Sequence, residues 1–277
     1  MKDGEKALIS LVPEGSEHRV VGDRKVILPS INLELWTTRL IQLSSWRLRG
    51  LNDPFWRLYI PVEGSARLTV NRDQDRIEID LEEGSAYVIP PHTTMFSEMT
   101  GTFTKWYMHF SLGQRGDWVS PGIFSIDMTQ TMMDSVANLS DLESNAHPWA
   151  SLRIVGEALE QLPESIWAQR RVDHRVEAAM EFMHGNMGRK LTAQEVAASA
   201  GVSVRNLNHL FQLHLGKSPM NVLLDFRLNQ ACRLLRHSDI SIDQIAEDCG
   251  FPNRYYFSRM MKQVRSTSPA AYRKAEW

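Results

Sequence analysis

Cysteine is scarce in this 277-residue chain, and long apolar runs are absent. The two cysteines, Cys232 and Cys249, are too few for a disulfide scaffold and form no paired motif typical of a zinc site. No apolar stretch approaches the roughly 18 residues that would cross a bilayer, which excludes an integral membrane protein. The first residues hold only a short apolar stretch, broken at Pro13, which does not resemble a secretory signal. We therefore expect a protein of the reducing cytoplasm.

Net charge is also small, −2 over the whole chain, but the two signs are unevenly distributed. Residues 1–171 carry 17 Lys and Arg against 23 Asp and Glu, whereas residues 172–277 carry 14 against 10. The basic C-terminal third is compatible with a polyanionic partner and equally with a chance imbalance of solvated charges. With 43% hydrophobic residues the chain can build packed cores, which excludes wholesale disorder.

The N-terminal half is rich in short β-strand patterns that are separated by turn residues. Strands are predicted at 56–62, 65–70, 76–81, 85–90 and 105–112. This spacing is typical of a small all-β barrel or jelly roll.

From residue 129 the apolar period changes to that of helices. A short helix is predicted over 129–143, and the next segment carries an apolar stripe at three- and four-residue steps. Such a stripe either packs on its own barrel or forms the seam of a homodimer. We favour the seam, because a barrel already has its own core. The predicted dimerisation residues are Trp149, Leu152, Val155 and Leu159.

The predicted fold class is α+β and multidomain. We expect a small β-barrel or jelly roll with dimerisation helices over 1–163, a linker over 164–172, and an all-α domain over 173–277. In the all-α domain, Thr192 begins a capping box, a long helix is predicted over 219–237, and Pro252 is predicted to open the last main helix.

One unit occurs twice in the all-α part of the chain. Residues 191–211 resemble residues 240–261, and Gly201 matches Gly250, 49 residues later. Each copy has the pattern of a helix-turn-helix, with a glycine for the tight turn and apolar residues that anchor the second helix. A single copy could be a generic helical hairpin, but two matching copies favour DNA recognition.

The exposed face of each second helix holds side chains that can pair with bases or phosphates. The helix over 219–237 would span about 28 Å, which is close to the roughly 34 Å of one DNA turn. The predicted DNA-binding residues are Arg205, Asn208 and His209 in the first copy and Arg254, Tyr255, Ser258 and Arg259 in the second.

The C-terminal region, over about 173–277, resembles AraC-type (AraC/XylS) bacterial transcription regulators. The residues that carry the resemblance are Ile245, Ala246, Gly250, Phe251, Tyr256, Phe257, Ser258, Arg259, Lys262, Ser268, Pro269 and Tyr272. That family usually has aromatic residues near Met261 and Arg265 and a glycine near Ser266, so the end of the last helix departs from its pattern. The resemblance implies a dimeric regulator of transcription, more often an activator that contacts RNA polymerase, controlled by a sugar or related metabolite.

The N-terminal part resembles the cupin-like effector domain of that family, in Gly64, in Glu83-Gly84 and in the Pro-Pro pair that precedes His92, where the family usually has glycine. Enzymatic cupins bind a metal through two or three His and a Glu, but Met95 stands where a histidine is expected. We therefore predict no catalytic residues, metal or other cofactor. The alternatives are a cupin-type metalloenzyme with a helical appendage and a ligand-dependent protein adaptor.

Strand alternation separates a polar and aromatic set of side chains from an apolar set. The polar set suits a hydroxylated or anionic ligand through stacking and hydrogen bonds. Either this set lines a cavity, or it faces solvent while the apolar set fills the core. The predicted effector-binding residues are Arg57, Tyr59, Met95, Lys105, Tyr107 and His109.

Overall fold

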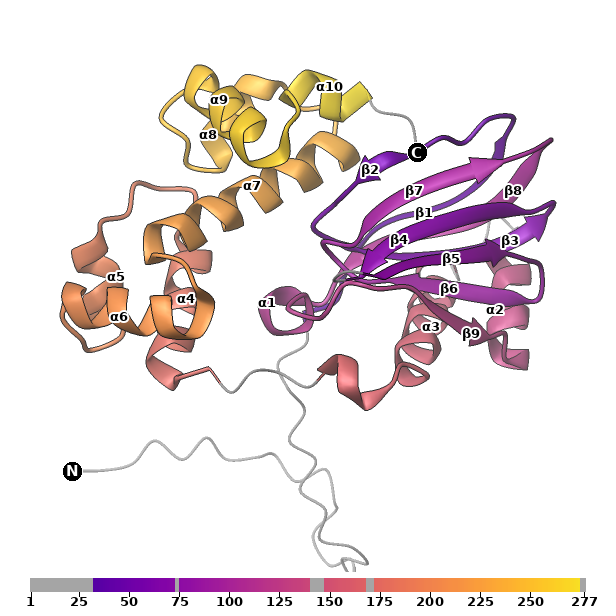
Figure 1. Cartoon of the computed structure of the whole chain (residues 1–277), viewed down its shortest axis with the longest axis horizontal. Helices are drawn as coiled ribbons and strands as arrows, with labels where there is room; N and C mark the ends of the chain where they lie inside the picture. Colours follow the sequence, from indigo (N-terminus) through magenta and orange to yellow (C-terminus); the bar gives the residue numbers. More distant parts are fainter. Residues whose placement is uncertain (1–31, 73–74, 140–146, 168–171, 275–277) are drawn as a thin grey trace, which may run out of the picture. The chain divides into compact units, whose positions relative to one another are not determined.

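Two antiparallel sheets form the N-terminal part of the structure, a computed structural model that describes residues 32–72, 75–139, 147–167 and 172–274. The first sheet has the strand order β1-β8-β3-β6-β9 and the second has the order β2-β7-β4-β5 (Figure 1). The strands of the first sheet are β1 (Glu34–Leu43), β3 (Trp56–Glu63), β6 (Ser85–Ile89), β8 (Phe103–Ser111) and β9 (Phe124–Asp127). Those of the second are β2 (Arg49–Leu51), β4 (Ala66–Arg72), β5 (Asp75–Leu81) and β7 (Thr94–Met99).

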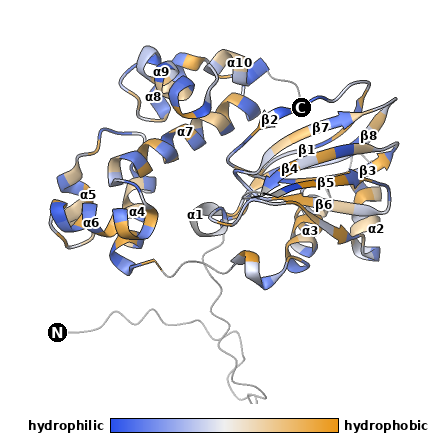
Figure 2. Cartoon of the chain, in the orientation of Figure 1, coloured by the Kyte–Doolittle hydropathy of each residue, from blue (hydrophilic) through white to orange (hydrophobic). Residues whose placement is uncertain are grey.

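All five predicted strands are present, within a few residues of their expected bounds. Strands β1, β2, β7 and β9 were not predicted individually. The last three are short, and the ten residues of β1 do not alternate between apolar and polar side chains. One core is enclosed by residues of both sheets, including Tyr59 and Tyr107 from the first and Leu68 and Met95 from the second. Figure 2 shows hydrophobic and hydrophilic residues mixed along the strands, as alternation requires.

The opposite face of the first sheet is covered by α2 (Gln130–Leu139) and α3 (His147–Glu160). Trp56, Met108 and Phe110 of the sheet share a core with residues of both helices. The predicted helix over 129–143 is confirmed as far as Leu139, and residues 140–143 lie outside the described part of the chain. A four-residue helix, α1 (Gly113–Gly116), follows β8.

The predicted linker begins with ordered structure. A short 3₁₀ helix, η1 (Glu164–Trp167), buries Ile166 in the same core, and the Trp167 ring stacks on Trp56 with centroids 5.8 Å apart. The first four residues of the expected linker are thus part of the β-sheet region, while residues 168–171 lie outside the described residues. The domain boundaries predicted at 163 and 173 stay predictions.

Helices make up the described C-terminal region. They are α4 (His174–Gly185), α5 (Ala193–Ser199), α6 (Val204–Leu215), α7 (Pro219–His237), α8 (Ile242–Asp248), α9 (Arg254–Arg265) and α10 (Pro269–Lys274). The capping box of Thr192 and Glu195 is confirmed, with each side chain accepting from the other residue's backbone N–H. The long helix has the predicted bounds, with Ser218 as its N-cap. No helix among these residues, or elsewhere in the described chain, is long and apolar enough to span a membrane.

The prediction that Pro252 opens the last main helix was wrong. Asn253 is the N-cap, its side chain accepts a hydrogen bond from the backbone N–H of Tyr256, and the helix begins at Arg254. Asn is a better N-cap than most residues because its carbonyl oxygen satisfies an N–H of the first turn. Pro252 belongs to the turn instead.

Two residues join the two halves of the helical region. Arg227 of α7 donates to the backbone carbonyls of Met187 (2.9 Å) and Arg189 (2.6 Å), which follow α4. Gly250, with φ of +72°, lies against the same segment, and a Cβ added there would collide with the carbonyl oxygen of Met187. The glycine is therefore required both by its backbone conformation and by this close approach.

Candidate functional site

Two helix pairs, α5–α6 and α8–α9, have the same local construction. In each pair the second helix begins at a side-chain N-cap, Ser203 in one and Asn253 in the other. Each second helix buries one apolar face, Leu207, Leu210 and Phe211 in α6 and Phe257, Met260 and Met261 in α9. The opposite faces are left for solvent or for a partner.

The predicted DNA-binding residues lie on those open faces. Arg205, Asn208 and His209 are exposed on α6, and Arg254, Tyr255 and Arg259 are exposed on α9, with Tyr255 at 87% exposure. Ser258 is half-buried. Because the Tyr255 ring is almost fully exposed, it contributes little to the packing of the fold and is free to contact a partner. This part of α9 therefore suits a binding surface.

Two of these side chains have partners within the chain. The Arg254 guanidinium donates to the Asp243 carboxylate (2.9 Å), in an ion pair in which both side chains are at least half exposed. The Arg259 guanidinium lies 5.2 Å from the ring centroid of Tyr256. Exposed ion pairs contribute little to stability, so Arg254 can exchange Asp243 for a phosphate or a base at small cost.

The predicted effector-binding residues all lie in the interior of the β-sheet region. In the register of β3 and β8, Arg57 is opposite His109 and Tyr59 is opposite Tyr107. These four side chains are buried, as are Lys105 and Met95, while the apolar set of the same strands packs on α2 and α3. Of the two orientations left open by the sequence, the polar set faces inward. Their role in binding an effector stays a prediction.

Basic groups dominate this interior. The Lys105 amine lies 3.4 Å from the ring centroid of Trp46 and 3.6 Å from that of Tyr59, a cation–π arrangement. Burial, together with the charge of Arg57, holds the pKa of Lys105 well below its usual range. Burial and the same arginine likewise lower the pKa of His109. Burial raises the pKa of Tyr59 to about 12.

Asp53 is a buried carboxylate beside these groups, and it forms an ion pair with Arg57. A buried arginine with a single carboxylate partner keeps donor groups for a further acceptor. Among the described residues, no group of three or more His, Cys, Asp or Glu has the geometry to hold a metal ion. The arrangement therefore suits ligand binding by charge and aromatic contact.

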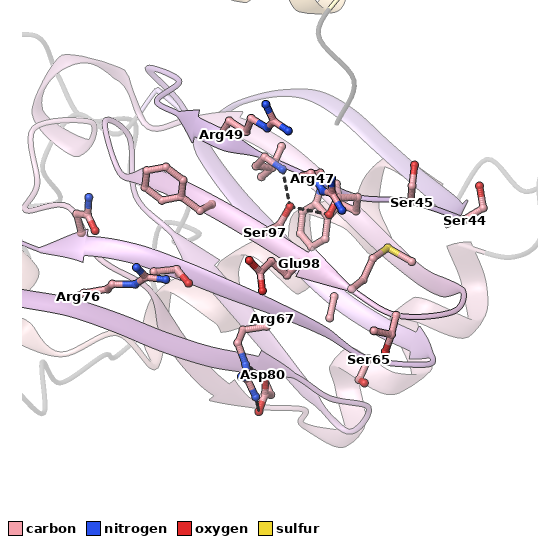
Figure 3. Close-up of a pocket in the computed structure, with 18 residues that line it drawn as sticks. Ser44, Ser45, Arg47, Arg49, Ser65, Arg67, Arg76, Asp80, Ser97 and Glu98 are labelled. Carbon is pink, nitrogen blue, oxygen red and sulfur yellow. Dashed lines mark hydrogen bonds and ion pairs between the residues drawn. The ribbon is translucent and has the colours of Figure 1, made fainter.

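A polar groove of about 1170 Å³ lies on the outer face of the second sheet and was not predicted (Figure 3). Four arginines line it, Arg47, Arg49, Arg67 and Arg76, among serines and acidic side chains. Arg67 forms a two-point ion pair with Asp80, at 2.6 and 3.0 Å. The alternation of Arg67, Thr69 and Asn71 with buried residues along β4 was the signal in the sequence for this polar face.

The groove is bordered by the segment before β2. Figure 3 shows Ser97 joined to that segment by dashed lines: its hydroxyl accepts from the backbone N–H of Leu48 (2.8 Å) and donates to the carbonyl of Trp46 (3.1 Å). These bonds fix the rim of the groove. None of the predicted effector residues lines the groove, which separates it from the interior set.

Comparison with known proteins finds similarity mainly in the C-terminal region. Residues 196–275 match the family model described as a helix-turn-helix domain. The HTH-type transcriptional regulator CdhR of Pseudomonas aeruginosa is 40% identical over 80 residues, 29% of this chain and 24% of that protein. The HTH-type transcriptional activator RhaS of Klebsiella pneumoniae is 29% identical over 161 residues, 56% of this chain and 58% of RhaS. The chain thus spans about a quarter of the length of CdhR and somewhat over half of the length of RhaS.

A solved structure shares the fold over most of the chain. ToxT from Vibrio cholerae, with an unsaturated fatty acid bound, is 12% identical with a TM-score of 0.54, over 89% of this chain and 97% of ToxT. At this identity the likeness shows the fold alone. Together with the family model and the named relatives, it confirms the predicted resemblance to AraC-type regulators of transcription.

Proposed function

We propose that this chain, through its AraC-type C-terminal region, is a sequence-specific DNA-binding regulator of transcription that is controlled by a small molecule. The observation that supports DNA reading is the exposed set of arginine, asparagine and aromatic side chains on α6 and α9. Residues of these types are the ones that pair with base edges and phosphates. We propose that α5–α6 and α8–α9 are two helix-turn-helix units that read one DNA site, and that the protein acts in the cytoplasm.

The spacing of the two units supports this proposal. Helix α7, of 19 residues, connects them and spans about 28 Å. Successive major grooves on one face of DNA are roughly 34 Å apart. One chain would therefore contact two grooves, as two subunits do in simple dimeric repressors.

The β-sheet region is the proposed effector domain. Its buried polar set, with Arg57 and Lys105, favours a ligand with hydrogen-bonding or anionic groups over a purely apolar one. ToxT, which shares the fold, has been solved with a small molecule bound, and this supports the placing of a ligand in the present chain. We further propose activation through RNA polymerase, by analogy with the activator RhaS, and a homodimer with Trp149 in its seam.

The proposal is tested by DNA binding of the full chain. A duplex selected from a random library by the wild-type protein serves as the specific probe, with fluorescence anisotropy as the readout. Arg254→Ala and Arg259→Ala are each expected to lower affinity by about 5- to 150-fold, or about 1–3 kcal/mol. The charge-matched control is Arg67→Ala, in the exposed pair on β4, which should bind like wild type.

Salt dependence provides the second readout. Affinity should fall steeply with salt concentration, because bound cationic side chains release counterions from DNA. Failure to select any duplex, or equal affinities for wild type and both variants, would refute the proposed reading surface.

A further inference from the structure

One buried carboxylate joins the β-sheet region to the last helix of the chain. Asp53, which precedes β3, is fully buried. One of its oxygens accepts a hydrogen bond from the Arg57 guanidinium, and the other accepts from the hydroxyl of Tyr272 on α10. Residues from Ile31 onward belong to one compact unit, in which these three side chains form a continuous chain of hydrogen bonds.

Arg57 is the end of this chain that faces the proposed effector set. It lies on β3, opposite His109 of β8, and its guanidinium carbon is 4.7 Å from the ring centroid of Phe55. The Phe55 ring in turn is 4.9 Å from the ring of His109. Because Arg57 is also hydrogen-bonded to Asp53, a change in the position of its guanidinium would move the Asp53 carboxylate.

Tyr272 is the end of the chain that belongs to the helical region. Its ring is buried in the core that also holds Phe257 and Met261 of α9, the second proposed reading helix. The Arg236 guanidinium of α7 lies 4.3 Å from its ring centroid. Movement of Tyr272 would therefore alter the packing beneath α9.

Three further contacts lie at the same junction. The Thr37 hydroxyl of β1 is 2.8 Å from Nδ1 of His237, at the end of α7. One turn earlier, the Arg233 guanidinium is 3.6 Å from the Glu34 carboxylate and 5.0 Å from the ring centroid of Trp36. These contacts are at least partly exposed, so the buried Asp53 carboxylate is the most sheltered polar link of the junction.

The donors of Arg57 indicate the chemical class of the ligand. Its Nη2 is used by Asp53, but Nε and Nη1 are buried without a hydrogen-bond partner in the described structure. Buried donors of a charged group are costly to leave unpaired, and a carboxylate is the acceptor that best fits a guanidinium.

We propose that the effector is a small carboxylate that binds Arg57, and that Asp53 relays its binding to the DNA-reading helices through Tyr272. This inference rests on the proposed function and specifies its regulation. A ligand carboxylate held by the unpaired donors of Arg57 repels the neighbouring Asp53 carboxylate, Asp53 shifts, and the hydroxyl of Tyr272 loses its acceptor. The junction then loosens, and the equilibrium between docked and undocked α10 changes.

The relay is tested first without a ligand. Hydrogen exchange by mass spectrometry compares the full-length wild type with Tyr272→Phe, which keeps the ring and removes the donor. Because a hydrogen bond to a charged group is lost, peptides of α10 and of the C-terminal end of α7 should exchange about tenfold faster or more. The matched control is Tyr87→Phe, which removes a tyrosine hydroxyl bonded to Asp80 and Glu82 within the β-sheet region. Near-UV circular dichroism verifies that each variant is folded.

The ligand class is tested next, with acetate as the probe and acetamide as its neutral counterpart at constant ionic strength. Acetate, but not acetamide, should speed exchange of the same peptides in wild type and should add nothing in Tyr272→Phe. Equal effects of the two probes, no effect of acetate, or wild-type exchange in Tyr272→Phe would overturn the proposal.

DNA affinity separates this inference from the proposed function. If wild type binds its selected duplex but neither acetate nor Tyr272→Phe changes exchange, the relay is wrong and the DNA-binding function stands. If wild type selects no duplex, the proposed function fails, and the exchange data still decide whether Asp53 links Arg57 to Tyr272.

Discussion

Ser266 occupies at the end of α9 the left-handed position that Gly216 occupies at the end of α6. Their φ angles are 57° and 65°, and each residue is the C-cap of its helix. A left-handed conformation is strained for a residue with a Cβ, but costs glycine little. The departure from the family's usual glycine, visible in the sequence, is therefore a point of backbone strain.

Ser266→Gly should stabilise the protein. Relief of the left-handed strain outweighs the greater entropy of glycine in the unfolded chain, so the free energy of unfolding should rise by about 0.5–1 kcal/mol. Urea denaturation measures it, and the mirror control Gly216→Ala should lower stability by about 1 kcal/mol. A loss of stability in Ser266→Gly would contradict this account.

Val155 and Trp149, both predicted in one dimer seam, should respond differently to truncation. Val155 is fully buried with Ile154 in the chain's own core, whereas Trp149 is 66% exposed at the start of α3. Val155→Ala should cost about 2 kcal/mol of folding stability, since it leaves a cavity. Trp149→Ala should leave stability within about 0.5 kcal/mol and weaken self-association.

Sedimentation equilibrium distinguishes these two outcomes. Leu152 and Leu159 are half-buried, and Leu159 packs on the same core as Val155, so the stripe is divided between core and surface. A Trp149→Ala protein that associates as wild type does would exclude this end of α3 from a dimer seam.

The two cysteines should be inert in the native protein. Both are buried, and burial raises the pKa of Cys232 to about 11 and that of Cys249 to about 12. The reactive thiolate is therefore scarce at neutral pH, and access is blocked. Ellman's reagent at pH 8 should label neither thiol until urea unfolds the chain. Because the two thiols have higher pKa values in the folded than in the unfolded chain, the free energy of unfolding is unaffected below about pH 9. It should fall as pH rises above that value, where the unfolded chain loses its thiol protons first.

Stability should also fall in mild acid. Burial lowers the pKa of His92 and that of His237 to about 4, from an ordinary value of 6.5. The unfolded state then binds protons first, so stability is full above pH 6.5 and declines as pH falls toward 4. Each histidine contributes at most about 3 kcal/mol over this range. Urea denaturation between pH 7 and pH 4.5 should show that the free energy of unfolding falls less with decreasing pH in His237→Gln than in wild type. If stability depended on pH in the same way in both proteins, His237 would have the same pKa in the folded and the unfolded chain, and the prediction would be wrong.

Local signals in the sequence predicted the helical region well because each helix begins and ends at a residue with one dominant physical effect. Thr192 caps its helix as expected, and α7 has the predicted bounds. The start of α9 was mispredicted at Pro252, because Asn253 caps the helix instead. The β-sheet region was harder, because pairing partners such as β2 and β7 are distant in sequence.

The interior site was predictable only in part. Alternation grouped Arg57 with Tyr59 on one face, but could not decide which face was inside. Asp53 was not predicted at all, because it precedes its strand and its partner Tyr272 lies at the far end of the sequence. Ion pairs and hydrogen bonds between distant segments leave no periodic pattern, so only the folded chain shows them.

Arg227 and Gly250 clamp the two halves of the helical region about α7, and this limits the operators that the proposed regulator can accept. A clamped pair of reading helices cannot follow its half-sites if their separation changes. Insertion of a single base pair between them would turn one half-site by roughly 35° around the duplex axis. DNA sites of this protein should thus tolerate changes in base sequence more readily than changes in the number of base pairs between the half-sites. Regulators whose DNA-reading units are joined by flexible linkers would not have this restriction.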